Sequence, residues 1–151
     1  MTQTLKSFLT GVNNKIFATR QGRQMHNLLQ YVVVDKTVGN QGNSDIVEII
    51  KNKSDLLPFF VSNAKTEVPI AGKVNGCFIS RRLDRLLINH DTKTIDFIDY
   101  KTDINKEEFI EKYKKQLKEY ADLLRSAYPG YKINGYVLWI NDWSLNQVIK
   151  Q

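Results

Sequence analysis

The sequence predicts an α/β or α+β domain in which helices flank a sheet. Apolar residues recur at helical spacing near the N-terminus and again after residue 105. Runs of β-forming residues lie between these two regions and at the C-terminal end, and polar or Gly/Pro-containing turns separate them. At 151 residues the chain is predicted to be a single domain, with residues 1–20 as a lead-in segment and a core over about 20–150.

The N-terminal part of the core is predicted to be helical. Apolar side chains follow the helical period from Gly22 to Val33. Residues 35–42 are polar, contain two glycines and are predicted to form a loop. A second short helix is predicted over 43–51, followed at 55–62 by a helical or irregular apolar segment that contains a proline.

An antiparallel meander is predicted in the middle of the chain. A strand begins at Glu67, and residues 72–76 are predicted to form a turn. The second strand covers 77–89, the polar residues 90–93 form the next turn, and the third strand covers 94–100.

A long amphipathic helix and one or two strands complete the predicted fold. Asn105 and Glu108 have the spacing of a capping box, and the Pro-Gly pair at 129–130 ends the helix. Residues 131–140 are a strongly apolar strand, and 143–149 are predicted to be a short strand at the sheet edge.

Composition excludes several classes of protein. The chain is 42% hydrophobic and 25% charged, which is ordinary for a globular domain, and its net charge of +6 favours an anionic partner such as nucleic acid. The single cysteine, Cys77, excludes an internal disulfide, a cysteine-rich zinc site and an iron–sulfur cluster held by four thiolates of this chain, and is predicted to be a small core residue. We expect a cytoplasmic protein without a membrane span, signal peptide or nucleotide cofactor, because no sufficiently long apolar run and no phosphate-binding glycine loop occur.

The predicted strand at 94–100 ends in charged residues. Ile95, Phe97, Asp99 and Lys101 alternate and therefore share one face, so an apolar face ends in a carboxylate and an ammonium. This pair can hold a metal ion beside a cation that positions water. For an isolated motif of this kind, a surface salt bridge between neighbours is the favoured interpretation, because so short a motif occurs by chance.

The preceding strand contains a second carboxylate, Asp84, within an apolar segment. A buried carboxylate requires a partner, which here is a metal ion or one of Arg81, Arg82 and Arg85. The short turn at 90–93 allows Asp84 and Asp99 to lie on adjacent strands. Two converging carboxylates suit Mg²⁺ or Mn²⁺.

Further candidate residues lie on the predicted helices. Gln116 and Tyr120 are four residues apart and share a helix face, although a core tyrosine with a flanking polar residue explains them equally. His26 is either a metal ligand or a half-buried structural histidine. We interpret Trp139 and Trp143 as core and edge packing rather than base-stacking residues.

In combination, these segments resemble the PD-(D/E)XK nuclease fold in its RecB/AddA branch, over roughly residues 20 to 150. The members of that branch are C-terminal nuclease domains of helicase–nucleases that process DNA double-strand breaks. The resemblance implies a restriction-endonuclease-like core, in which a mixed central sheet with an antiparallel meander is flanked by helices. The segments that carry it are Gly22–His26, Gly76 with Arg82–Arg85, Ile98–Thr102 and Gln116–Ala121.

The resemblance also implies roles for individual residues. His26, Asp84 and Asp99 would ligate Mg²⁺ or Mn²⁺, with the Tyr100 carbonyl as a further ligand. Lys101 would orient or activate the attacking water and help to neutralise the phosphate.

Other matching positions would support the site or bind DNA. Gln116 and Tyr120 match the QxxxY helix element, which supports the catalytic site and contacts DNA. Glu67 is either a carboxylate behind the metal ligands or an exposed residue at the strand start. The favoured basic candidates for DNA contacts are Arg81, Arg82 and Arg85. The helix lysines are weaker candidates, because they can equally form a solvated helix face that is interleaved with Glu111 and Glu119; they are Lys112, Lys114, Lys115 and Lys118.

The implied function is divalent-metal-dependent hydrolysis of DNA, as an exonuclease rather than an endonuclease, in double-strand break repair and recombination. The partners would be DNA and a helicase domain or subunit that this chain lacks. Relatives with an iron–sulfur cluster need four cysteines, which are absent here. The alternatives are a catalytically weak nuclease-fold module that binds DNA or a partner, and an unrelated basic α/β protein in which the DxK motif is chance.

Overall fold

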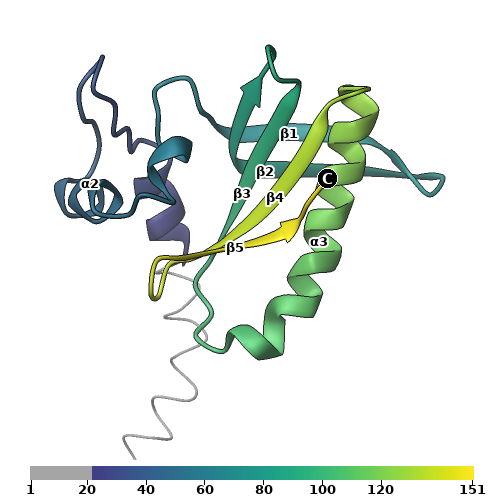
Figure 1. Cartoon of the computed structure of the whole chain (residues 1–151). Helices are drawn as coiled ribbons and strands as arrows, with labels where there is room; N and C mark the ends of the chain where they lie inside the picture. The colour runs from purple at the N-terminus through teal and green to yellow at the C-terminus, as the bar shows by residue number, and fades with distance from the viewer. Residues whose placement is uncertain (1–21) are drawn as a thin grey trace, which may run out of the picture.

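A computed structural model of the chain describes residues 22–151 (Figure 1). The lead-in predicted over 1–20 lies outside the described residues. The fold is mixed α/β, with a five-stranded sheet in the order β1-β2-β3-β4-β5. Helical elements cover the sheet from two sides, with α2 on one side and α3 on the other (Figure 1). The predicted α/β class is confirmed at this level.

The N-terminal segment is helical, as predicted. Residues 22–29 are helical, α2 covers Ser44–Lys51, and a short 3₁₀ helix, η1, covers Leu57–Phe59. The first helix is shorter than the apolar run suggested. It ends before Val33 because this residue instead forms an isolated antiparallel bridge with Gln41.

The first hairpin pairs β1, Lys65–Val74, with β2, Cys77–Asn89. The turn is shorter than the predicted range 72–76, because β1 continues to Val74, which pairs with Cys77. Only Asn75 and Gly76 form the turn, and both have positive φ, 51° and 78°. This two-residue turn matches the right-handed twist of paired strands, which explains why the hairpin closes so tightly.

The thiol of Cys77 is exposed, so the prediction of a core cysteine is wrong. Cys77 begins β2 beside the hairpin turn, where the two strands extend past α3 (Figure 1). The two tryptophans follow the prediction, because Trp139 is fully buried and Trp143 is partly buried against the core. Within residues 22–151, no helix is both long enough and apolar enough to cross a membrane.

The second half of the fold contains a parallel crossover. β3, Thr94–Lys101, continues the antiparallel meander with β2, and α3, Lys106–Ala127, begins after the predicted cap, Asn105. The chain returns in β4, Lys132–Trp139, which pairs with β3 in parallel, and β5, Ser144–Ile149, adds the predicted antiparallel edge strand.

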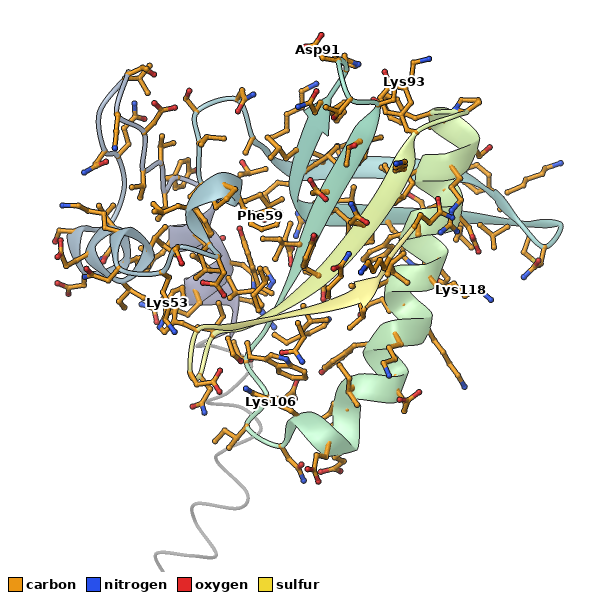
Figure 2. All side chains as sticks on the ribbon, in the orientation of Figure 1. Lys53, Phe59, Asp91, Lys93, Lys106 and Lys118 are labelled. Carbon is orange, nitrogen blue, oxygen red and sulfur yellow. The ribbon has the colours of Figure 1, made fainter. Side chains whose placement is uncertain are left out.

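Two clusters of buried side chains hold these layers together. On one side of the sheet, Ile98 and Tyr100 pack against the N-terminal helical segment, where Phe59 points toward the sheet (Figure 2). On the other side, Ile95 and Phe97 pack against α3. β3 is therefore buried on both faces, and its charged C-terminal end reaches the surface between α3 and the helix at 22–29.

Candidate functional site

A cleft of about 980 Å³ opens at the C-terminal end of β3. It brings together side chains from the first helix, the β1–β2 hairpin, β3 and α3. The helix at 22–29 packs on the sheet and brings His26 to Asp84. The predicted site residues that line the cleft are His26, Glu67, Arg82, Asp84, Asp99, Lys101, Gln116 and Tyr120.

His26 and Asp84 form a close pair. His26 Nε2 lies 3.2 Å from Asp84 Oδ2, and Nδ1 lies 2.7 Å from the Gly22 carbonyl oxygen. Because both ring nitrogens face oxygen acceptors, the doubly protonated imidazolium fits best. The hydrogen bond to Asp84 is the main cause that raises the pKa of His26 to about 9. The Tyr100 backbone N–H donates to the same Asp84 oxygen at 2.7 Å, so the partners of Asp84 are the histidine and a backbone amide rather than an arginine.

Asp99 and Lys101 form the second charged pair. Lys101 Nζ lies 2.7 Å from Asp99 Oδ2, and the Asp99 side chain is only 7% exposed. The ammonium is not aligned as a hydrogen-bond donor, so among the described residues Asp99 Oδ2 accepts no hydrogen bond. Burial raises the pKa of Asp99 to about 6; Lys101 opposes the rise and the nearby charge of Asp84 adds to it.

Lys101 is held in place by α3. Its ammonium donates to Gln116 Oε1 at 2.9 Å and lies 4.2 Å from the centre of the Tyr113 ring. Gln116 Nε2 in turn donates to the Tyr120 hydroxyl at 2.7 Å. Both ends of the Gln116 amide are therefore used, and Tyr120 is only 4% exposed. This arrangement favours a role for Gln116 and Tyr120 in positioning Lys101 over direct contact with DNA.

Tyr113 and Asp103 were not singled out by the sequence as site residues. Tyr113 was assigned to the apolar stripe of α3, but it lies three residues before Gln116, a spacing that places both on one helix face. Its hydroxyl donates to Asp103, which also lines the cleft. Burial is the main cause that raises the pKa of Tyr113. Helical spacing could have identified Tyr113, whereas no local signal marks Asp103.

The prediction that Arg85 contacts DNA is wrong. Arg85 is 1% exposed, and its guanidinium lies beneath the first helix. Nη2 donates to the carbonyl oxygens of Leu29 and Val32, at 2.8 and 3.2 Å. Nη1 donates to the carbonyl of Phe59 at 3.2 Å, and Nε donates to the Tyr100 hydroxyl at 2.9 Å. Arg85 therefore joins the N-terminal helical segment to the sheet.

The other two arginines form ion pairs near the surface. Arg81 pairs with Glu119 of α3 at 3.2 Å. Arg82 Nε lies 2.8 Å from Glu67 Oε2, but the Arg82 side chain is 67% exposed. A DNA contact by Arg82 therefore stays a prediction that the geometry permits. Glu67 lies in the cleft wall with a 21% exposed side chain, so it is not an exposed residue at the strand start.

Glu67 also has an unusual backbone conformation, with a φ of 54°. The pairs on either side of it are Thr66↔Arg85 and Val68↔Leu83, so Glu67 lies across from Asp84 without being paired to it. Leu83 and Leu86 both pack in the α3 cluster, although odd and even positions of a regular strand face opposite sides. β2 therefore changes direction at Asp84, and this local distortion aims the carboxylate into the cleft.

The chemistry of these donors fits a divalent cation. Two carboxylates and an imidazole are the oxygen and nitrogen ligands that Mg²⁺ and Mn²⁺ accept, and Asp99 Oδ2 is a buried acceptor without a hydrogen bond. Two positively charged groups, His26 and Lys101, stand beside the carboxylates. Within residues 22–151, however, no three His, Cys, Asp or Glu side chains are already arranged as a metal-binding group. A metal-ligand role for His26 would require loss of its second ring proton, because an imidazolium has no free nitrogen lone pair.

Comparison with known proteins adds no relative, since neither a protein-family model nor a curated protein sequence matches this chain significantly. The fold and the cleft define a mixed α/β protein with two buried carboxylates and a partly buried lysine at the end of a central strand.

We expect Asp99→Asn to raise the melting temperature of the metal-free protein. The pKa of Asp99 is raised from 3.8 to about 6, so the folded state binds the proton more tightly than the unfolded state does. The associated stability is present below pH 4 and is lost as the pH rises through 6. The gain from Asp99→Asn is on the order of 2 kcal/mol, roughly 4–8 °C, above pH 6. Calorimetric melts of both proteins at pH 4.5 and pH 7.5 (~3 units apart) test this; a gain that is equal at both values contradicts it.

Proposed function

We propose that this protein is a divalent-metal-dependent DNA nuclease with a restriction-endonuclease-like fold of the RecB/AddA type. One observation carries the proposal. Asp84 and Asp99, from adjacent strands, enter a single cleft in which α3 fixes Lys101 beside Asp99. Burying two carboxylates beside a partly buried ammonium costs desolvation free energy, and charged clusters of this kind in a cleft are enriched at catalytic sites.

The net charge of the chain, +6, supports an anionic substrate, because a basic protein attracts phosphodiester groups. Within the cleft, the cations Arg23, Arg82, Lys101 and Lys112 are offset by Glu67, Asp84, Asp99 and Asp103. The cleft itself would therefore attract phosphate only with a divalent cation bound to its carboxylates. DNA is the nucleic acid that the resemblance to helicase–nucleases favours. A helicase domain or subunit would then deliver the strand.

The residues of the chain have separable roles in this proposal. A divalent cation held by Asp84, Asp99 and His26 would lower the pKa of water and offset negative charge on the phosphate. Lys101 presents an ammonium at the same place, orients the attacking water and stabilises the charge that develops on the phosphate. Gln116 keeps this ammonium in position. The expected products carry 5′-phosphate and 3′-hydroxyl ends.

Incubation of linear and circular DNA with the protein in Mg²⁺, in Mn²⁺ and in EDTA tests the proposal. We expect cleavage in either metal without ATP, and attack on linear DNA alone if the enzyme is an exonuclease. The matched control is Asp99→Asn, which removes one charge from the proposed metal site. Cleavage in EDTA, or by Asp99→Asn at the parental rate, rules out the proposed site.

One observation favours the second candidate, a nuclease-fold module that binds DNA without cutting it. His26 and Asp84 bind each other, and no ready-made metal group exists among residues 22–151. Such a module would bind DNA equally well in metal and in EDTA. It would leave the strand intact in both, as would its Asp99→Asn variant.

The binding of Mn²⁺ is expected to release a proton from His26. An unperturbed histidine has a pKa of 6.5, but the hydrogen bond to Asp84 raises the pKa of His26 to about 9, so the ring is protonated at pH 7. Metal affinity should then rise by up to about tenfold per pH unit between pH 7 and pH 9. Titration calorimetry in buffers of different ionisation enthalpy counts the protons released. His26→Ala should bind Mn²⁺ more weakly and lose this proton release, and identical behaviour of the two proteins returns His26 to a structural role.

A further inference from the structure

One face of the β1–β2 hairpin is open to solvent beyond the cleft. Residues that pair across an antiparallel ladder lie on the same face, as do alternate residues of each strand. Three consecutive cross-strand pairs of this kind are exposed, and we call them the hairpin platform. The pairs are Pro69↔Arg82, Ala71↔Ser80 and Lys73↔Phe78.

The opposite face of the hairpin is covered by α3. Gly72 lies so close to α3 that a Cβ atom there would be 3.1 Å from Leu123 Cδ2. Ile70 packs against the α3 cluster. α3 therefore supports the hairpin from behind and leaves the hairpin platform as its free surface. Figure 1 shows the hairpin extending past α3.

The hairpin platform is continuous with the cleft. Arg82 belongs to both, and it is two residues from Asp84 along β2. Phe78 lies four residues further toward the turn, which is about 13 Å at the rise of a β-strand. A chain molecule that leaves the cleft along β2 would pass Arg82 first and reach Phe78 near the hairpin turn.

The side chains of the hairpin platform match the groups of a nucleic acid strand. Phe78 is 70% exposed, and Lys73 is its cross-strand neighbour, so an aromatic and a cationic side chain start from paired positions on this face. Arg82 lies at the other end, where its Nε pairs with Glu67 while the side chain remains 67% exposed. Aromatic rings stack on bases and cations bind phosphates. Short side chains between the two ends leave room for the strand.

We propose that the hairpin platform binds a single strand of nucleic acid and leads it to the cleft. Phe78 stacks on a base, while Lys73 and Arg82 contact phosphates. This inference rests on the proposed function, because the platform continues a cleft that would bind DNA. It adds a binding surface outside the cleft and gives the strand a path along β2.

The test measures binding of a fluorescent single-stranded oligothymidylate by anisotropy, in an Asp99→Asn background so that the strand stays intact. Phe78→Leu keeps an apolar side chain but removes the ring, and it should weaken binding about 5- to 150-fold. Its salt dependence should not change, because no charge is lost. Phe78→Trp should bind at least as tightly as the parent.

The charge test has a matched control on the other side of the hairpin. Lys73→Ala should reduce the slope of log affinity against log salt by about 0.7, the value for one contact with a single strand. Lys118 was a candidate DNA contact in the sequence, but it projects from α3 (Figure 2) and lines the groove behind the hairpin, outside both the cleft and the platform. Lys118→Ala therefore removes the same charge away from the platform. Its slope should equal that of the parent.

The platform is overturned if Phe78→Leu binds as tightly as the parent, or if Lys118→Ala lowers the slope as much as Lys73→Ala. Melting temperatures confirm that the variants are folded, and Phe78 is exposed enough for its replacement to leave the core intact. The parent protein separates the two proposals. Metal-dependent cleavage without any effect at Phe78 overturns the platform alone, whereas neither binding nor cleavage overturns the platform and the proposed function together.

Discussion

Lys101→Met is expected to slow DNA cleavage by a factor on the order of 10² to 10³ at saturating DNA. Losses of this size follow the removal of a preorganised group that stabilises charge in the transition state. Lys101 Nζ is fixed by Asp99, Gln116 and the Tyr113 ring, so no other cation can take its place without rearrangement. Single-turnover rates with linear DNA in Mg²⁺ measure the loss. Lys112→Met is the matched control, because Lys112 lines the same cleft from the exposed face of α3.

The stability of these variants separates catalysis from folding. Lys101→Met removes the cation that contacts Asp99 and leaves only His26, which pairs with Asp84, near this buried carboxylate, so it should lower the melting temperature. Adding Asp99→Asn removes the buried charge and should restore the melting temperature, but not the rate. Restored cleavage in the double variant would show that Lys101 merely neutralises Asp99, and cleavage by Lys101→Met at the parental rate would refute the site.

The sequence predicted the parts of the site that depend on strand alternation. Asp99 and Lys101 share a face with Ile95 and Phe97, and the latter two do pack against α3. The charged end of the otherwise apolar face of β3 therefore predicted where the cleft lies. Helical spacing likewise placed Gln116 and Tyr120 together, where a direct hydrogen bond now joins them. Both results follow from local geometry, which the order of residues determines.

Predictions failed where the structure departs from local geometry. Regular alternation places Arg85 on the same face as Arg81 and opposite Arg82, and it gave no reason to expect burial of Arg85 rather than of the other two. β2 changes direction at Asp84, opposite the positive φ of Glu67, and Arg85 then points beneath the first helix. The carbonyl groups that Arg85 binds belong to residues more than 20 positions away in the sequence, so no pattern near Arg85 marks them.

The other error has a similar origin. Cys77 follows a turn and begins a strand of β-forming residues, which favoured a buried thiol. Cys77 is exposed because the β1–β2 hairpin extends past α3. The extent of this overhang depends on the relative lengths of the hairpin and of α3, which are distant in the sequence.

Arg85→Met is expected to destabilise the protein by about 2–5 kcal/mol, because it leaves buried carbonyl oxygens without a donor at about 1–3 kcal/mol each. The substitution keeps a long apolar side chain over Phe60, whose ring lies 4.1 Å from the guanidinium carbon. The carbonyl oxygens of Val32 and Phe59 lose the Arg85 donor, whereas the Leu29 carbonyl keeps the backbone N–H of Val32. Because domains of this kind are stable by only about 5–15 kcal/mol, the loss is a large part of the total.

Urea unfolding followed by circular dichroism measures this effect, with Arg82→Met as the matched control on the same strand. Arg82 is 67% exposed in its ion pair with Glu67, so its replacement should change the stability by less than about 1 kcal/mol. Hydrogen exchange of Arg85→Met should show earlier loss of protection in residues 22–62 than in α3, since Arg85 joins that segment to the sheet. The segment also carries His26, so loosening it should weaken Mn²⁺ binding although Arg85 lies outside the cleft. Equal unfolding free energies for the two arginine variants would contradict this role of Arg85.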